Sequence, residues 1–91
     1  MTYLMARLDV ADFDAWKQIF DSDPAGRVQA ANGHRICRST ENANELIVQV
    51  DFDSAEQAKA FRDRLSASGA LDRVKLPAPP IIVEETETIR Y

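Results

Sequence analysis

Two hydrophobic periodicities alternate along the 91 residues, and their order limits the folds that the chain can adopt. A period of two residues, typical of strands, occurs in four segments: 2–8, 34–39, 45–52 and the final stretch 81–91. Apolar residues three or four apart, typical of helices, occur in two segments: 13–20 and 54–69. The predicted order is therefore β-α-β-β-α-β. This is the α+β ferredoxin-like arrangement, in which two helices cover one face of a four-stranded antiparallel sheet, and the length fits one domain spanning 1–91.

Helix-capping side chains mark where the helical segments begin. Asp12 precedes the first, and Ser54 with Gln57 forms a capping box at the start of the second. The first helix is interrupted at Asp23 and Pro24, a typical N-cap and first-turn pair for another helical piece that ends at Gly33. We therefore expect a broken helix between the first two strands.

The face of the sheet that no helix covers is expected to hold a mixture of apolar and polar side chains. Strand alternation assigns six residues to this face: Tyr3, Met5, Arg7, Ile47, Gln49 and Asp51. This mixture is too apolar for water and too polar for a core, so that packing against the same face of a second copy is the natural solution. We predict a homodimer, in which Arg7 pairs with Asp51 or with a carboxylate of the second chain.

Charge and the distribution of apolar residues exclude several classes of partner. The formal net charge is -4 and the basic residues are not clustered, which argues against nucleic-acid binding. No apolar run approaches the ~20 residues needed to span a bilayer, and the first residues do not form a signal peptide. A single cysteine fits a reducing compartment, so we expect a cytoplasmic protein without a membrane partner.

The only histidine and the only cysteine lie close together, in the stretch NGHRICRST. His34 and Cys37 are three residues apart on a predicted strand, so their side chains point to opposite faces of the sheet. Within one subunit they cannot form the hydrogen-bonded pair that cysteine-histidine catalysis needs. Cys37 is therefore expected to be a small buried apolar residue.

Several stretches of the chain resemble small proteins of the dimeric α/β barrel superfamily. They are LDVADFDAWKQIFD, Arg27, GHRICR, NELIVQVDF and the PAPP step into the final strand. The superfamily includes cofactor-independent monooxygenases of antibiotic biosynthesis, haem-degrading monooxygenases, polyketide cyclases and muconolactone isomerases. The resemblance implies a pocket between sheet and helices, and a dimer whose sheets form a barrel.

Two departures from the superfamily pattern bear on chemistry. Leu8 stands where relatives often have a histidine. The haem-degrading branch uses an asparagine on its first strand and a histidine on a helix, and the chain has neither. Haem chemistry is therefore disfavoured.

The register of the predicted hairpin decides which face His34 takes. A loop symmetric about Asn42 pairs Ile36 with Val48 and places three residues on the helix-covered face: His34, Ile36 and Arg38. A loop one residue longer or shorter places Arg35 and Cys37 there instead. We favour the symmetric loop because it buries Ile36. His34 is then either a general acid or base in a pocket or a partly exposed histidine on an edge strand.

Five other residues are candidates for a substrate pocket. By its spacing Trp16 is a core residue, and its size makes it a wall of the pocket as well. Arg27 either reaches inward to hold a carboxylate or phenolate, or is a solvated partner of Asp23. Arg38 is a candidate for holding an oxyanion, and the walls are expected to include Leu8 and Val50.

No motif for a metal, a cofactor phosphate or a nucleophilic serine occurs, so we expect neither a metal nor a cofactor. Two functions remain open. One is a cofactor-independent cyclase, isomerase or monooxygenase acting on a partly apolar organic molecule. The other is a non-catalytic ligand-binding or dimerisation module. An enclosed pocket of about 300 Å³ or more, reached by a polar side chain, favours the enzyme.

Overall fold

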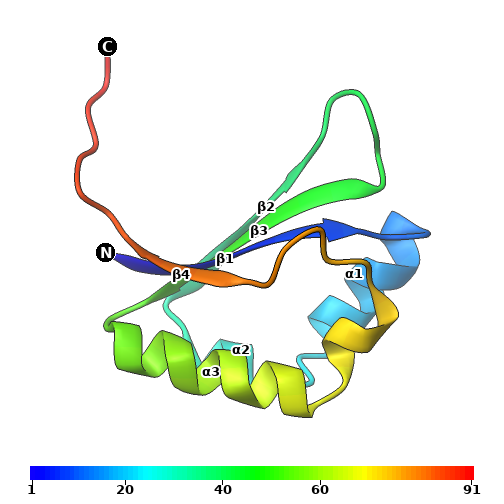
Figure 1. The fold of residues 1–91 in the computed structure, drawn as a ribbon, viewed down its shortest axis with the longest axis horizontal. Helices are drawn as coiled ribbons and strands as arrows, with labels where there is room; N and C mark the ends of the chain where they lie inside the picture. The colour runs from blue at the N-terminus through cyan, green and yellow to red at the C-terminus, as the bar shows by residue number, and fades with distance from the viewer.

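The strands pair in the order β2-β3-β1-β4 in a computed structural model that describes residues 1–91, apart from the side chain of Arg73. Along the chain the elements are β1 (Thr2–Asp9), α1 (Phe13–Asp21), α2 (Arg27–Ala30), β2 (Gly33–Arg38), β3 (Glu45–Phe52), α3 (Ala55–Ala67), the short 3-10 helix η1 (Ala70–Arg73) and β4 (Ile81–Glu84). All the strand pairs are antiparallel, and the helices lie on one side of the sheet (Figure 1). The predicted ferredoxin-like fold is confirmed.

Both predicted helix caps are present. The Asp12 carboxylate accepts a hydrogen bond from the backbone N–H of Asp14 at 3.0 Å, at the start of α1. The Ser54 hydroxyl accepts one from the backbone N–H of Gln57 at 3.2 Å, at the start of α3. Each bond satisfies an N–H that the first turn of a helix leaves without a partner.

The break between α1 and α2 is confirmed, but the second piece is shorter than predicted. It begins at Arg27, after Gly26 in the left-handed conformation, and ends at Ala30 instead of Gly33. The Asp23 carboxylate nevertheless caps it, accepting from the backbone N–H groups of Arg27 at 2.6 Å and Val28 at 3.1 Å. The cap therefore acts across a loop, and not from the position next to the first turn.

The prediction of a strand over 81–91 is wrong beyond Glu84. The last residue pair of β4 and β1 joins Glu84 to Thr2, and one further bond runs from the Glu85 N–H to the Met1 carbonyl at 2.9 Å. Residues 85–91 belong to no strand of the structure. We call these seven residues the C-terminal tail.

The core lies between the sheet and α3. It contains Leu4 and Leu8 from β1, and Phe52 and Leu46 from β3 are almost fully buried. The opposite face holds the six residues predicted for it, and the structure pairs Tyr3 with Asp51, Met5 with Gln49 and Arg7 with Ile47. We call this the uncovered face. Of the two partners predicted for Arg7, Asp51 is wrong, because Arg7 pairs with Glu45 of its own chain, which lies diagonally across from it. A contact with a carboxylate of a second chain stays a prediction.

Candidate functional site

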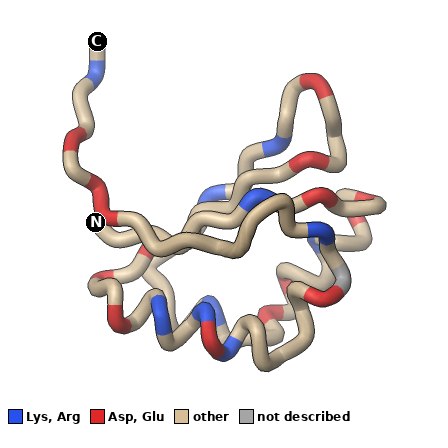
Figure 2. Tube along the Cα trace, in the orientation of Figure 1, with Lys and Arg blue, Asp and Glu red and all other residues tan. Residues whose placement is uncertain are grey.

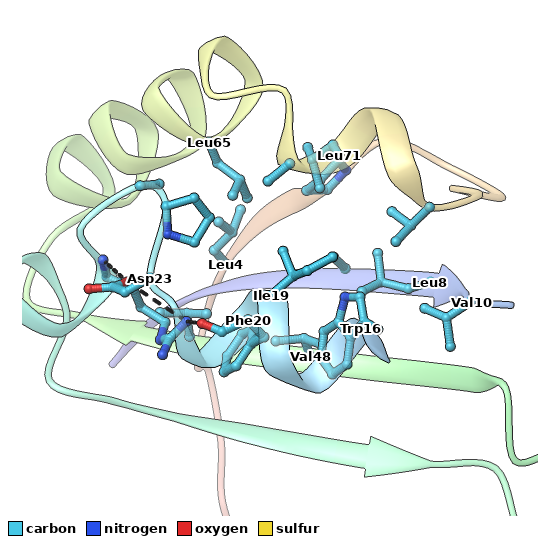
Figure 3. A pocket seen from close by; sticks show the side chains of 18 of the residues that line it. Leu4, Leu8, Val10, Trp16, Ile19, Phe20, Asp23, Val48, Leu65 and Leu71 are labelled. Carbon is cyan, nitrogen blue, oxygen red and sulfur yellow. Dashed lines mark hydrogen bonds and ion pairs between the residues drawn. The ribbon is translucent and has the colours of Figure 1, made fainter. Parts of the chain in front are cut away.

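A cavity of about 220 Å³ lies between the sheet and the helices (Figure 3). Its walls are mainly apolar and come from β1, β3, α1, α3 and the segment after α3, with members such as Leu4, Leu8, Val48, Val50, Trp16, Ile19, Phe20, Leu65 and Leu71. A cavity of about 150 Å³ binds benzene, whereas drug-sized ligands occupy about 300 Å³ or more. The cavity therefore suits a molecule about the size of one substituted ring.

Helix α1 forms one wall of the cavity. Phe13, Trp16 and Phe20 lie along one side of it, with ring centroids 5.9 Å and 5.1 Å apart. No residue of α1 is fully buried, although its apolar side faces the sheet. Space therefore remains between this helix and the sheet, and Trp16 and Phe20 line it.

Arg27 is the charged side chain most deeply buried at the cavity. It is 7% exposed, and its guanidinium carbon lies 3.7 Å from the centre of the Phe20 ring. Its Nη1 donates to the Phe20 carbonyl at 3.0 Å and lies 3.9 Å from an oxygen of Asp23. Arg27 is therefore not the solvated partner of Asp23 that one alternative described, because it is buried and lines the cavity although it lies near Asp23.

The contacts of Arg27 leave it able to hold an anion. A guanidinium has five N–H donors in a planar fork, and one protein acceptor lies within hydrogen-bond distance. The ion pair with Asp23 is long at 3.9 Å, so its attraction does not neutralise the guanidinium fully. A carboxylate or phenolate placed in the cavity can supply the acceptors that such a group prefers.

The hairpin register is the predicted one. Ile36 lies opposite Val48, His34 opposite Val50 and Arg38 opposite Leu46. The side chains of β2 that alternate with these three lie on the uncovered face. Cys37 is one of them, and it is exposed in the single chain instead of buried as expected.

His34 lies beside the cavity and outside its lining. The imidazole is exposed and meets the Phe20 ring edge-on, with centroids 4.9 Å apart. It borders a shallow surface hollow together with Arg27, Asn32 and neighbouring residues. Because β2 is an outer strand and the cavity lies over β1 and β3, a residue at this position shares the helix-covered face without reaching the cavity.

The surroundings of His34 lower its pKa below the ordinary value of 6.5. Partial burial is the largest cause, and the positive charges of Arg27 and Lys17 add to it, while Asp21 and Asp51 act in the opposite direction. The imidazole is therefore neutral at neutral pH. In this state it accepts a proton more readily than it donates one.

Arg38 is also separated from the cavity. Its guanidinium carbon lies 4.9 Å from the centre of the Phe13 ring, and the side chain is exposed. Of the predicted site residues, the cavity lining brings together Trp16, Arg27, Leu8 and Val50, and leaves out His34 and Arg38. Phe20, which touches Arg27 and His34, was not among the predicted site residues. Its place on the apolar side of α1 follows from the sequence, but its contacts with Arg27 and His34 do not.

The described part of the chain contains no group of three His, Cys, Asp or Glu side chains arranged to hold a metal ion. It also contains no helix with the length and apolar character that crossing a bilayer requires.

Comparison with known proteins gives similarity in structure only. No protein-family model and no curated protein sequence matches the chain. A solved structure from Bordetella bronchiseptica, named "putative antibiotic biosynthesis monooxygenase", is 21% identical, with a TM-score of 0.63 over 97% of both chains. A protein of the same name from Nitrosomonas europaea is 11% identical, with a TM-score of 0.57 over 96% of this chain and 100% of that one. The chain therefore shares the ferredoxin-like fold of these solved structures, as its sequence pattern predicted.

Proposed function

We propose that the protein binds a small, partly apolar organic acid in the cavity and converts it as a cofactor-independent enzyme of the cyclase, isomerase or monooxygenase type. Two findings support this. Among the described side chains, the wall of the apolar cavity contains one strongly buried cation, Arg27. The structures with the same fold are named as monooxygenases.

The observation that carries the proposal is the position of Arg27. Apolar walls stabilise a bound ring by about 25 cal/mol for each Å² removed from water. They also exclude water, which strengthens the attraction between the guanidinium and an oxyanion. A site of this composition binds a phenolate or enolate better than the neutral molecule, and this preference is what a reaction through an enolate requires.

His34 remains our candidate for the proton shuttle in this reaction. Its low pKa keeps it neutral and able to accept a proton. Since Phe20 lies between the imidazole and the cavity, the proton must pass at the edge of that ring, directly or through one water molecule. Arg38 is proposed to hold a second oxyanion at the outer side of Phe13.

We also propose that the protein acts as a homodimer in the cytoplasm, joined through the uncovered face. Ile47 on that face is 47% exposed and Ile81 of β4 is 56% exposed. Burying them against a second copy removes apolar surface from water. The neighbouring Arg7–Glu45 pair supplies polar contacts at the rim.

Binding is tested with 4-nitrophenol, which titrates near neutrality and whose anion fits a one-ring cavity. Trp16 is the only tryptophan and lines the cavity, so quenching of its fluorescence reports occupancy. We expect saturable quenching, corrected for absorption with N-acetyltryptophanamide. Arg27→Met is expected to weaken binding of the phenolate about tenfold or more, and binding of nitrobenzene much less.

Two further variants separate a loss of charge from a loss of fold. Lys59→Met removes a positive charge from an exposed position of α3 and is expected to leave both affinities unchanged. Ala6→Val fills part of the cavity from β1. It is expected to weaken the binding of both ligands several-fold and to leave the melting temperature unchanged. If Arg27→Met weakens the binding of the phenolate and of nitrobenzene equally, the role of Arg27 is contradicted. If the parent protein shows no saturable quenching, the binding site itself is contradicted.

The second candidate function is a non-catalytic ligand-binding or dimerisation module. The volume of about 220 Å³ favours it, because it lies below the usual range for ligand sites. The position of His34 outside the cavity also favours it. If a turned-over substrate is found, unchanged rates in both His34→Ala and His34→Gln remove the proton-shuttle role, while loss in His34→Ala alone leaves a hydrogen-bonding role.

A further inference from the structure

The cavity between the sheet and the helices is longer than it is wide. Its wall on the first strand consists of alternate residues, Leu4, Ala6, Leu8 and Val10, so that the cavity follows β1 along most of its length. At about 3.3 Å per residue, the distance from Leu4 to Leu8 is about 13 Å, and Val10 extends it to about 20 Å. Figure 3 shows the same direction, with Asp23 at one end of the cavity and Val10 at the other.

The width of the cavity follows from its volume and its length. A volume of about 220 Å³ spread over about 13 to 20 Å gives a mean cross-section of about 11 to 17 Å². A spherical cavity of about 150 Å³, which is large enough for benzene, has a mean cross-section of about 23 Å². An extended chain therefore fits this space better than a compact ring does.

The buried cation of the cavity lies at the Leu4 end. Arg27 stacks on Phe20, and the edge of the Phe20 ring meets His34. His34 and Leu4 lie on the two sides of the same residue of β3, Val50. The carboxylate of the neighbouring Asp23 accepts hydrogen bonds from two backbone N–H groups of α2, which offsets its negative charge. This end of the cavity therefore remains suited to an anion.

An acidic residue marks the opposite end. Asp12 lines the cavity two residues after Val10, where its side chain caps α1. A carboxylate of the ligand meets a like charge at this end and an opposite charge at Arg27. A molecule with one carboxylate therefore has one preferred orientation in the cavity.

The wall between the two ends is apolar. Trp16 and Ile19 reach the cavity from α1, and Phe61 and Leu65 reach it from α3. Figure 2 shows charged residues of both signs along α3, but the two residues of this helix in the wall are apolar. An apolar chain that passes between the helices and the sheet is therefore removed from water along its length.

We propose that the ligand of this site is an unbranched aliphatic carboxylic acid of about eight to ten carbons, with its carboxylate at Arg27 and its chain directed along β1 toward Val10. An extended chain advances about 1.2 Å per bond, so that about 13 Å holds about eleven bonds. The volume of about 220 Å³ holds about seven groups the size of a water molecule. The inference rests on the proposed function and narrows its organic acid to one chemical class.

The first test compares two acids of the same formula and charge but different shape. Octanoate is unbranched, and its isomer 2-propylpentanoate is branched and compact. Isothermal titration calorimetry, below the concentrations at which these acids form micelles, is expected to give octanoate a dissociation constant at least tenfold lower. From hexanoate to decanoate the dissociation constant is expected to fall about fourfold for each added methylene, and dodecanoate is expected to gain nothing more.

The outcomes separate this inference from the proposed function. Equal affinity of the two isomers, or no gain from added methylenes, would overturn the inference. Saturable quenching of Trp16 by 4-nitrophenol in the same preparation would then show that the proposed site stands without it. If neither 4-nitrophenol nor any of the acids binds, both fail.

The second test examines the orientation of the chain. Ala15 is an exposed residue of α1 near Asp12 that also lines the cavity. Ala15→Leu is expected to weaken the binding of decanoate at least fivefold and to leave that of hexanoate within twofold. Ala60→Leu, at an exposed position of α3 outside the lining, is the matched control and is expected to change neither. Equal weakening of both acids by Ala15→Leu, at an unchanged melting temperature, contradicts the proposed orientation.

Discussion

At the scale of single residues, Phe20 connects the two polar groups of the candidate site. Its ring carries the Arg27 guanidinium on one face and meets the His34 imidazole at its edge. Arg27 is buried at the cavity and His34 lies outside it. Because the charge of Arg27 already lowers the pKa of His34, we expect an anion bound at Arg27 to raise that pKa.

The pKa of His34 provides a prediction at this scale. We expect a value below 6.5, because burial disfavours the imidazolium and Arg27 repels it. Arg27→Met removes one cause and is expected to move the pKa upward, although burial keeps it below 6.5. A proton NMR titration measures it without ambiguity, since the chain has one histidine; a pKa at or above 6.5 in the parent protein would contradict the environment described for His34.

The same shift predicts the direction of a pH effect on stability. The unfolded chain takes up the proton at the ordinary pKa of 6.5 and the folded chain only at lower pH. Between these two values the unfolded state binds more protons, so the free energy of unfolding falls as the pH falls. Urea denaturation above and below this window is expected to show this decrease in the parent protein and a smaller one in His34→Gln; an increase on acidification attributable to His34 would have the wrong sign.

At the scale of the elements, the sequence predicted correctly the features that depend on residues close together in the chain. Capping by Asp12 and Ser54 depends on residues two or three positions away, and the register of β2 on β3 depends on a short loop. The extent of the last strand depends instead on where β1 begins, which the sequence of the tail does not contain. The cavity was expected from family resemblance alone, because periodicity tells which residues face inward and not whether they fill the space.

The cap of α3 gives a prediction for an element. Ser54→Ala removes the acceptor for the Gln57 N–H and is expected to lower the free energy of unfolding by about 1 kcal/mol. Ser66→Ala, on an exposed position of the same helix, is the matched control and is expected to be neutral or slightly stabilising. Urea denaturation of the three proteins checks this, and equal stability of Ser54→Ala and the parent protein would show that the cap contributes nothing.

At the scale of the whole molecule, the main feature is that the helices and the sheet form two layers. Helices cover one face of the sheet, and the other face holds apolar groups beside charged ones. Of the site, the inward-facing residues were predictable, while the separation of His34 and Arg38 from the cavity follows from the position of β2 at the outside of the sheet. The sequence of β2 alone does not contain this separation, because it depends on the order of all four strands in the sheet.

The uncovered face gives a prediction at this scale. Ile47→Glu places a charge near the centre of the proposed interface and is expected to give a monomer, because the charge loses its water on association without gaining a partner. Glu56→Gln on α3, away from this face, serves as the control and is expected to leave the dimer intact. Analytical ultracentrifugation distinguishes the two, and a dimer that tolerates Ile47→Glu does not use this face.

The central claim is that a sheet covered by helices on one side needs a second copy. It is tested most directly by the mass of the unmodified protein in solution. Light scattering coupled to size-exclusion chromatography at micromolar concentration is expected to give twice the 10.2 kDa of one chain. A stable particle of 10.2 kDa under the same conditions would contradict the account.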